Sequence, residues 1–311
     1  MKPRVGLQDG LTHRCGAEPA TPAAPGWSGQ FRAFACGGRP VVTSDQRSTI
    51  SCMTSGFNGD AADYYARYRR GYPSSVIDAL TRALRLSSAD TIIDLGCGTG
   101  QLSLSLASRV ARVIGVDPAP DMLRHAAAAA LDGQAGNVEW ILGTAEDLVA
   151  ISAKHGGVGA ITLANAIHLV DRAQLFAAAQ TALYPGRGLA IIANSTPLWL
   201  QDAAWSHALR TFLERWLGTR LTSYCGTDDE TRSVYRHELI ALGYGVDEIR
   251  VEYTDILSLE QIVGGVFSAM SDRIPAASDR IRFASELERA LGDTDPYTET
   301  VQVRTLIGRV R

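Results

Sequence analysis

The chain has 311 residues with a formal net charge of −3, and 46% of its residues are hydrophobic. This composition is typical of a soluble globular protein and excludes a chain that is disordered throughout. The small acidic excess without a basic stripe argues against a nucleic-acid partner, and no apolar run reaches the roughly eighteen residues of a membrane span.

The cysteines are scattered along the chain and odd in number. They are Cys15, Cys36, Cys52, Cys97 and Cys225. None forms a C-x-x-C pair or lies near a histidine at metal-site spacing, so we predict neither a metal centre nor a disulfide framework. Free thiols favour a reducing, cytoplasmic location. No continuous apolar segment follows the early basic residues, which argues against a signal peptide.

Residues 1–55 differ in composition from the rest of the chain. They are rich in Gly, Pro, Ala, Ser and Thr and show no helical or strand period, as in GAEPATPAAPGWSGQ. Such a segment cannot bury enough apolar surface to compensate for the conformational entropy lost on ordering. We therefore predict a disordered N-terminal extension before a folded domain at 56–311. A translated leader upstream of a true start at Met53 is the other interpretation.

From Phe57 onward, helical and strand patterns alternate. Helices are predicted over 60–69 and after Pro73, which suits a first helical turn. Short apolar β-branched runs predict strands at 91–98, 111–117, 138–143, 159–166 and 188–195. Helical patterns lie between them, from Gln101 onward, at 119–132, near 145–154 and at 172–184. Strands separated by such helices indicate a parallel sheet that is covered on both faces.

The alternation breaks after Ser195. Residues 197–218 have a helical pattern and hold three of the five tryptophans, and strands are predicted at 247–256 and 299–310 with two helices between them. We therefore expect an α/β fold: a Rossmann-like, doubly wound, mostly parallel seven-stranded sheet. Residues 196–245 are expected to form a helical lid or acceptor insertion after the fifth strand.

The tryptophans of this insertion have two interpretations. They are Trp199, Trp205 and Trp216. Aromatic side chains at helical spacing commonly pack in a core, and they also line pockets for small molecules.

A glycine-rich turn follows the first predicted strand. Asp94 ends that strand, and Gly96, Gly98 and Gly100 follow at alternate positions before a helix. Glycines there allow a tight turn and the close approach of a ligand at the carboxyl edge of the sheet. A dinucleotide site requires the spacing G-x-G-x-x-G, whose third glycine is replaced here by Gln101. The spacing therefore argues against a nicotinamide cofactor.

Asp117 ends the second predicted strand. It lies about twenty residues beyond the glycine turn, where a carboxylate can bind both ribose hydroxyls of an adenosyl ligand. The other interpretation is a helix N-cap, which the following Pro-Ala-Pro suits poorly.

Polar residues also follow the third predicted strand. They are Thr144, Glu146 and Asp147, with Ala145 between them. Groups at this position can bind an adenine edge, and Asp147 is equally suited to capping the next helix.

Asn165 ends the fourth predicted strand, and His168 lies just beyond it. His168 is our candidate general base, because it follows a strand end on the ligand side and its ordinary pKa is near neutrality. The other interpretation is a structural histidine that is hydrogen-bonded to the next helix. Asn194, Ser195 and Tyr224 are further candidates for contacts to the acceptor.

These motifs resemble the class I S-adenosylmethionine (SAM)-dependent methyltransferases. The chain is similar above all to the small-molecule branch with the ubiquinone/menaquinone and trans-aconitate methyltransferases, over roughly 57–311. The resemblance rests on YYARYRRGYP, DLGCGTGQLS, VIGVDPAPDML, GTAEDL, ANAIHLVDR, LSLEQIVGGVFS and VQVRTLIGRV, which occur in this order.

The resemblance implies a SAM site with assigned residues. Asp94 and the backbone from Gly96 through Cys97 and Gly98 to Gly100 would hold the methionine part, and Asp117 the ribose. Met122 would pack on the adenine face, Ala145 and Glu146 would contact the adenine edge, and the Asn165 backbone would lie beside the methionine part.

Two residues before the sheet complete the implied site. Tyr65 and Arg69 would cover the cofactor and pair with its carboxylate, a task that suits arginine because its planar fork matches a carboxylate. The other interpretation of this pair is a surface helix.

The chain departs from its relatives at three places. Relatives often carry aspartate where Thr144 stands, Arg-Pro where Arg69-Arg70 stands, and Trp where Leu169 stands. The first change is expected to weaken adenine recognition, and the last to reshape the acceptor pocket.

The function predicted from these motifs is methyl transfer from SAM to O, N or C of a small metabolite. A sulfonium is a good leaving group, so in-line displacement mainly requires positioning. Three alternatives stay open: a cyclase or lyase of the same fold, a regulatory subunit with a decayed site, and a nicotinamide oxidoreductase. We expect a monomer or homodimer with a small-molecule acceptor, no nucleic acid, no membrane span and no metal.

Overall fold

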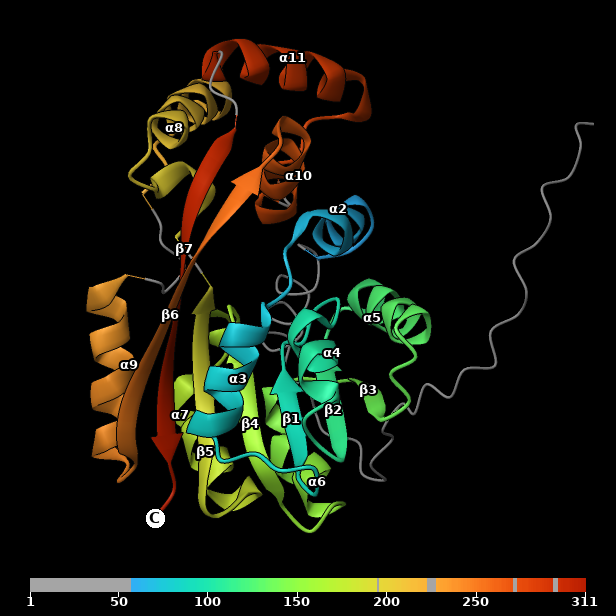
Figure 1. Ribbon diagram of the computed structural model, residues 1–311, viewed down its shortest axis with the longest axis vertical. Helices are drawn as coiled ribbons and strands as arrows, with labels where there is room; N and C mark the ends of the chain where they lie inside the picture. The colour runs from blue at the N-terminus through green and yellow to red at the C-terminus, as the bar shows by residue number, and fades with distance from the viewer. Residues whose placement is uncertain (1–56, 195, 223–227, 271–272, 293–295) are drawn as a thin grey trace, which may run out of the picture. The chain divides into compact units, whose positions relative to one another are not determined.

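The computed structural model describes residues 57–194, 196–222, 228–270, 273–292 and 296–311 (Figure 1). The extension predicted over 1–55 therefore lies outside the described residues, as do Ser195 and Tyr224. None of the described helices is both long and apolar enough to cross a bilayer.

A seven-stranded sheet with the order β3-β2-β1-β4-β5-β7-β6 forms the body of the described chain. The first five strands run parallel, and β7 pairs antiparallel with both β5 and β6. The strands are β1 Thr91–Leu95, β2 Arg112–Asp117, β3 Val138–Leu142, β4 Val158–Ala164, β5 Leu183–Asn194, β6 Gly245–Leu257 and β7 Tyr297–Arg309. The predicted doubly wound, mostly parallel sheet of seven strands is confirmed.

Helices cover both faces of the sheet because its central strands are apolar on both sides. On one face α3 and α4 bury Leu80 and Leu106 with Ile92 of β1. On the other face α6, α7 and α9 contribute to a second core that includes Phe176 and Leu239. The helices of the body are α3 Ser74–Ala83, α4 Gln101–Ala107, α5 Pro120–Asp132, α6 Leu148–Ala153, α7 Arg172–Ala182 and α9 Asp229–Ala241.

A helical cap lies at the far end of β6 and β7, which pair over thirteen residues and continue from the sheet into it (Figure 1). The cap comprises the short helix η3 Leu198–Leu200 and the helices α8 Ala204–Leu217, α10 Leu259–Ala269 and α11 Arg280–Leu291. Its apolar core is separate from the two cores of the body. Helix α2 Asp60–Tyr68 packs against α10 of the cap and α5 of the body.

The tryptophans pack in the core of the cap. Trp199 and Trp205 are buried, and Trp205 Nε1 donates a hydrogen bond to the Thr298 carbonyl (2.9 Å). Trp216 is partly buried, and its ring lies 5.0 Å from the Phe283 ring. The core-packing interpretation is confirmed for Trp199 and Trp205, whereas Trp216 packs against this core and also lines a surface pocket with Arg215 and Arg282.

The residues predicted to form one helical insertion, 196–245, belong to two different parts of the structure. Helix α8 belongs to the cap, whereas α9 packs on the sheet, where Glu238 accepts hydrogen bonds from Arg172 of α7 (2.7 and 2.8 Å). The helix predicted from 197 begins only at Ala204. Ser206 Oγ accepts from Gln201 N (3.0 Å) and donates to the Leu198 carbonyl (2.7 Å), so a side chain takes the hydrogen bonds that a helix would use.

Candidate cofactor site

The glycine loop, residues 96–100, turns the chain sharply between β1 and α4. Gly96, Gly98 and Gly100 have φ values of 63°, 54° and 84°, in the left-handed region. At Gly96 a Cβ atom would lie 2.6 Å from Ala166 Cβ, so a larger residue would push against the segment after β4. Because Gly96 has no side chain, the loop after β1 can lie in close contact with the segment after β4.

Asp94 anchors the glycine loop from beneath. Its buried carboxylate accepts hydrogen bonds from Ser103 Oγ of α4 (2.6 Å) and Thr162 Oγ1 of β4 (2.7 Å). Burial raises the pKa of Asp94 to about 6, although these hydrogen bonds oppose the rise. Both carboxylate oxygens of Asp94 thus have protein partners already. A contact between Asp94 and the methionine part of SAM stays a prediction.

Asp117 joins the glycine loop to the end of β2. Its carboxylate accepts from Gly98 N (2.8 Å) and from Ala119 N (2.9 Å), and the side chain is buried. Burial raises the pKa of Asp117, and the two backbone hydrogen bonds oppose this. The N-cap of α5 is Ala119, so Asp117 is not the cap of that helix. The arrangement expected of an adenosyl site, with both motifs at one edge of the sheet, is present.

Thr99 is a loop residue that the sequence argument did not single out. Its hydroxyl oxygen is buried, and no described group hydrogen-bonds to it. A buried hydroxyl without a partner is costly, and a polar ligand on the loop would satisfy it. This observation fits a loop that binds a polar cofactor.

The segment after β3 forms the neighbouring part of the site. Gly143 N donates to the Asp117 carbonyl (3.1 Å), which places this segment beside β2. Thr144 and Asp147 form a capping box, in which Asp147 Oδ2 accepts from Thr144 N (2.8 Å). Asp147 therefore takes part in capping the short helix η1 Ala145–Asp147, but its side chain makes no cap hydrogen bond to α6, the next helix for which a cap was considered. Glu146 is exposed at this tip, and Ala145 is partly buried.

Met122 lies beneath α2 rather than open to solvent. It is buried in a small cluster with Ala62 and Ala119, against which Tyr65 packs. Its packing on an adenine ring stays a prediction.

Tyr65 lies directly on the glycine loop. Its Cε1 is 3.7 Å from the position that a Cβ on Gly98 would occupy. Burial raises the pKa of Tyr65, and the nearby Asp117 and Asp94 carboxylates add to this, although Arg69 opposes it. The Arg69 guanidinium carbon lies 5.2 Å from the Tyr65 ring centroid, and Arg69 Nε donates to Ser268 Oγ of α10 (2.9 Å). Helix α2 packs on α10 and α5, and Tyr65 is partly buried whereas Arg69 is exposed, so the surface-helix interpretation stays open for Arg69.

Asn165 and His168 lie at the end of β4. Asn165 has a left-handed φ of 53°, and its Oδ1 accepts from Asn194 N of β5 (3.0 Å). His168 is in the short helix η2 Ile167–Leu169 and keeps solvent access, while partial burial lowers its pKa. No described residue hydrogen-bonds to His168, so the hydrogen bond expected of a structural histidine is not found among the described residues.

Tyr72 extends the site toward β5, and sequence reasoning missed it. Burial raises its pKa, with Tyr65, Asp94 and Tyr253 nearby and the Asn194 amide as a hydrogen-bond partner. The Asn194 Oδ1 atom is buried without a described partner. The tyrosine in the motif YYARYRRGYP was a signal that could have found Tyr72, but only the fold shows that it reaches β5.

A comparison with protein families agrees with this geometry. A family model described as a methyltransferase domain matches residues 92–186, which contain the glycine loop, Asp117 and Asn165. Residues 92–186 are therefore similar to the methyltransferase domains of this family. SAM as methyl donor, which the sequence motifs predict, agrees with this family.

Relatives of the methyltransferase domain differ in what they are described to do. An uncharacterized methyltransferase of Mycobacterium tuberculosis is 36% identical over 137 residues, which are 44% of this chain and 51% of that protein. The human tRNA (uracil-5-)-methyltransferase homolog A is 43% identical over 65 residues, 21% of this chain and 10% of that protein. The chain thus spans about half the length of the mycobacterial relative and a tenth of the human one.

A solved structure shows that the fold of the methyltransferase domain is shared. It is a proposed type II methyltransferase from Anaeromyxobacter dehalogenans, with a TM-score of 0.51 and 20% identity. The match covers 78% of this chain and 98% of that chain.

Proposed function

We propose that this chain is a SAM-dependent methyltransferase that methylates O, N or C of a small molecule. The observation that carries the proposal is the hydrogen bond from the Gly98 backbone to the Asp117 carboxylate. It joins a tight glycine turn to a carboxylate at adjoining strand ends, the edge where open α/β sheets bind ligands, and this supports a role of Asp117 in binding a ribose.

The chain's residues divide the cofactor between them. Asp117 would accept hydrogen bonds from the ribose, because each carboxylate oxygen can accept more than the one backbone bond it has. The loop from Gly96 through Cys97 to Gly100 would hold the amino-acid part, which Tyr65 and Arg69 would cover. Met122, Ala145 and Glu146 would contact adenine, and Asn165 would lie beside the methionine part.

The chemistry requires little covalent help from the protein. SAM supplies an activated methyl group, whose bond to sulfur breaks as the bond to the acceptor forms, leaving S-adenosylhomocysteine (SAH). The protein holds the reacting groups in line and excludes water from them. His168 would remove the acceptor proton, since a lowered pKa keeps its imidazole neutral at pH 7.

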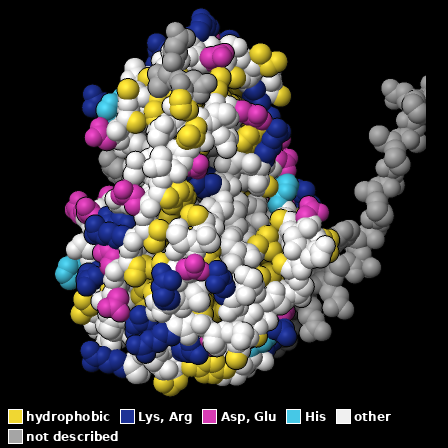
Figure 2. Space-filling model, viewed as in Figure 1, with side chains coloured by type: hydrophobic (Ala, Val, Ile, Leu, Met, Phe, Trp, Pro, Cys, Tyr) yellow, Lys and Arg dark blue, Asp and Glu magenta, His cyan; other side chains and the backbone are white. Residues whose placement is uncertain are grey.

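A small molecule fits the remaining features better than a nucleic acid. The cap lies beyond the end of the sheet toward which the parallel strand β5 points (Figure 1), and it would act as a lid for the acceptor. Acidic side chains accompany the basic ones over the face shown in Figure 2, in keeping with a net charge of −3. A nucleic-acid acceptor would call for a continuous basic surface.

Two measurements test the proposal. In isothermal titration the protein is expected to bind SAM and SAH and to ignore NAD; binding of NAD alone would contradict the assignment of the loop. After incubation with SAM and a small-molecule extract, SAH is expected to accumulate. Accumulation of 5′-methylthioadenosine alone would favour the cyclase or lyase alternative.

A further inference from the structure

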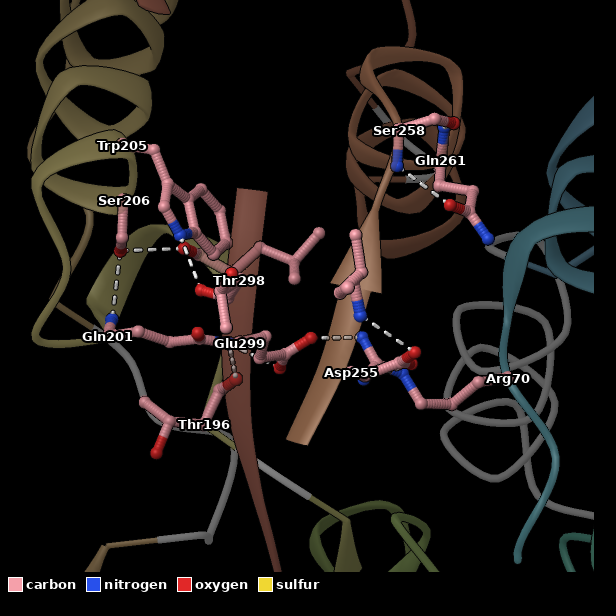
Figure 3. Close-up of polar contacts among 12 residues, drawn as sticks. Arg70, Thr196, Gln201, Trp205, Ser206, Asp255, Ser258, Gln261, Thr298 and Glu299 are labelled. Carbon is pink, nitrogen blue, oxygen red and sulfur yellow. Dashed lines mark hydrogen bonds and ion pairs between the residues drawn. The ribbon is translucent and has the colours of Figure 1, made fainter. Parts of the chain in front are cut away.

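A partly buried polar network joins four separate parts of the chain where the cap meets the sheet (Figure 3). Glu299 on β7 accepts hydrogen bonds from Arg70 Nη2 at one oxygen and from Gln201 Nε2 (2.5 Å) at the other. Arg70 Nη1 also donates to Asp255 Oδ2 on β6 (3.0 Å), and Gln201 donates to the Thr196 carbonyl (3.3 Å). The network therefore links the α2–α3 connection, β6, β7 and the segment after β5.

Arg70 neutralises two carboxylates that face each other. Asp255 and Glu299 are directly opposed on antiparallel strands, where like charges repel. The Glu299 side chain is 1% exposed, against 39% for Asp255. A buried carboxylate that loses its cation is strongly destabilising. The folded state thus requires the Arg70 guanidinium at this place.

The anchored Arg70 constrains its neighbour in the chain. Arg69 directly precedes it at the C-terminal end of α2, and Arg69 stacks on Tyr65, which lies on the glycine loop. In contrast, the Arg67–Glu260 ion pair of α2 is 71% and 64% exposed. Exposed pairs contribute little, so the network around the buried Glu299 carboxylate is the stronger restraint on this end of α2.

We propose that Glu299 is a positioning residue, which acts through Arg70 to hold Arg69 where it binds the carboxylate of SAM. This inference rests on the proposed function, because it takes the amino-acid part of SAM as the partner of Arg69. Through Arg70 and Arg69, the loss of Glu299 affects ligands that carry the carboxylate. Ligands that end at the adenosyl group bind to Asp117 and the segment after β3, which the network does not touch.

The test compares SAH, which has the carboxylate, with 5′-methylthioadenosine, which lacks it. Isothermal titration of each ligand is done on the wild type, Glu299→Gln and the matched control Glu260→Gln. Glu299→Gln is expected to bind SAH about five- to tenfold more weakly and methylthioadenosine within about twofold of the wild type. Glu260→Gln makes the same chemical change at the exposed pair and is expected to match the wild type for both ligands.

Two further variants separate positioning from loss of fold. Glu299→Asp keeps the charge and is expected to recover part of the SAH affinity. Asp255→Asn removes the half-exposed partner of the same guanidinium; it is expected to fold even if Glu299→Gln does not, with a smaller loss that is again confined to SAH.

The outcomes distinguish this inference from the function on which it rests. Equal losses for the two ligands, or no loss for SAH in the folded variants, overturn the role of Glu299 and leave the SAM site standing. A wild type that binds neither ligand contradicts the proposed function and this inference with it.

Discussion

Replacing Asp117 with alanine removes the carboxylate that joins the glycine loop to the end of β2. In the free protein, the change leaves the N–H groups of Gly98 and Ala119 without their acceptor. In the complex, it also removes the acceptor for the ribose hydroxyls. Hydrogen bonds to a charged group contribute about 1.5–3 kcal/mol each, so we expect SAH affinity to fall by about 2–4 kcal/mol, or roughly 30- to 1,000-fold.

The assay for Asp117→Ala is isothermal titration with SAH, accompanied by thermal unfolding to show that the variant is folded. Asp132→Ala is the matched control, because this exposed aspartate lies at the end of α5 and is expected to leave SAH binding unchanged. A folded Asp117→Ala protein whose SAH affinity lies within about twofold of the wild type would refute the assignment of this carboxylate to the ribose.

Three other predictions concern the base and the loop. Because partial burial lowers the pKa of His168 and the neutral imidazole is the base, methyl transfer should be lost as pH falls through a pKa below 6.5, and His168→Gln should remove this step from the pH–rate profile. Gly96→Ala combines a left-handed φ with a Cβ 2.6 Å from Ala166 Cβ and should destabilise the fold by about 2–4 kcal/mol in urea unfolding; an unchanged midpoint would contradict the tight turn. The pKa of Asp94 is about 6 in the fold against an ordinary 3.8, because the fold favours the protonated carboxyl. The contribution of Asp94 to the free energy of unfolding is therefore fully present below pH 3.8 and is lost as the pH rises through about 6. Asp94→Asn should therefore gain up to about 3 kcal/mol relative to the wild type between pH 4 and 7, and parallel pH curves for the two proteins would contradict this.

The parts of the site that sequence could predict are those made by local chain geometry. The turn at Gly96–Gly100 and the carboxylate of Asp117 each follow a buried strand, and parallel strands bring their carboxyl ends to one edge. Their hydrogen bond forms because β1 and β2 are neighbours in the sheet, whereas the alternation of strands and helices predicted only that the sheet is mostly parallel.

The cap could not be predicted because distant segments build it. Helix α8 and the α10–α11 pair are separated by α9 and β6, yet they share one core. The helical pattern over 196–245 does not show that α9 packs on the sheet, since an amphipathic helix fits either place. Similarly, Arg70 and Glu299 are 229 residues apart, and only the folded position of the α2–α3 connection beside β6 and β7 brings them together.

The most direct test of the central claim is a crystal structure of the protein with SAH. We expect the ribose hydroxyls within hydrogen-bonding distance of the Asp117 carboxylate and the homocysteine part along the backbone of residues 96–100, beneath Tyr65. SAH bound at another place, with the glycine loop and Asp117 free of it, would contradict the account.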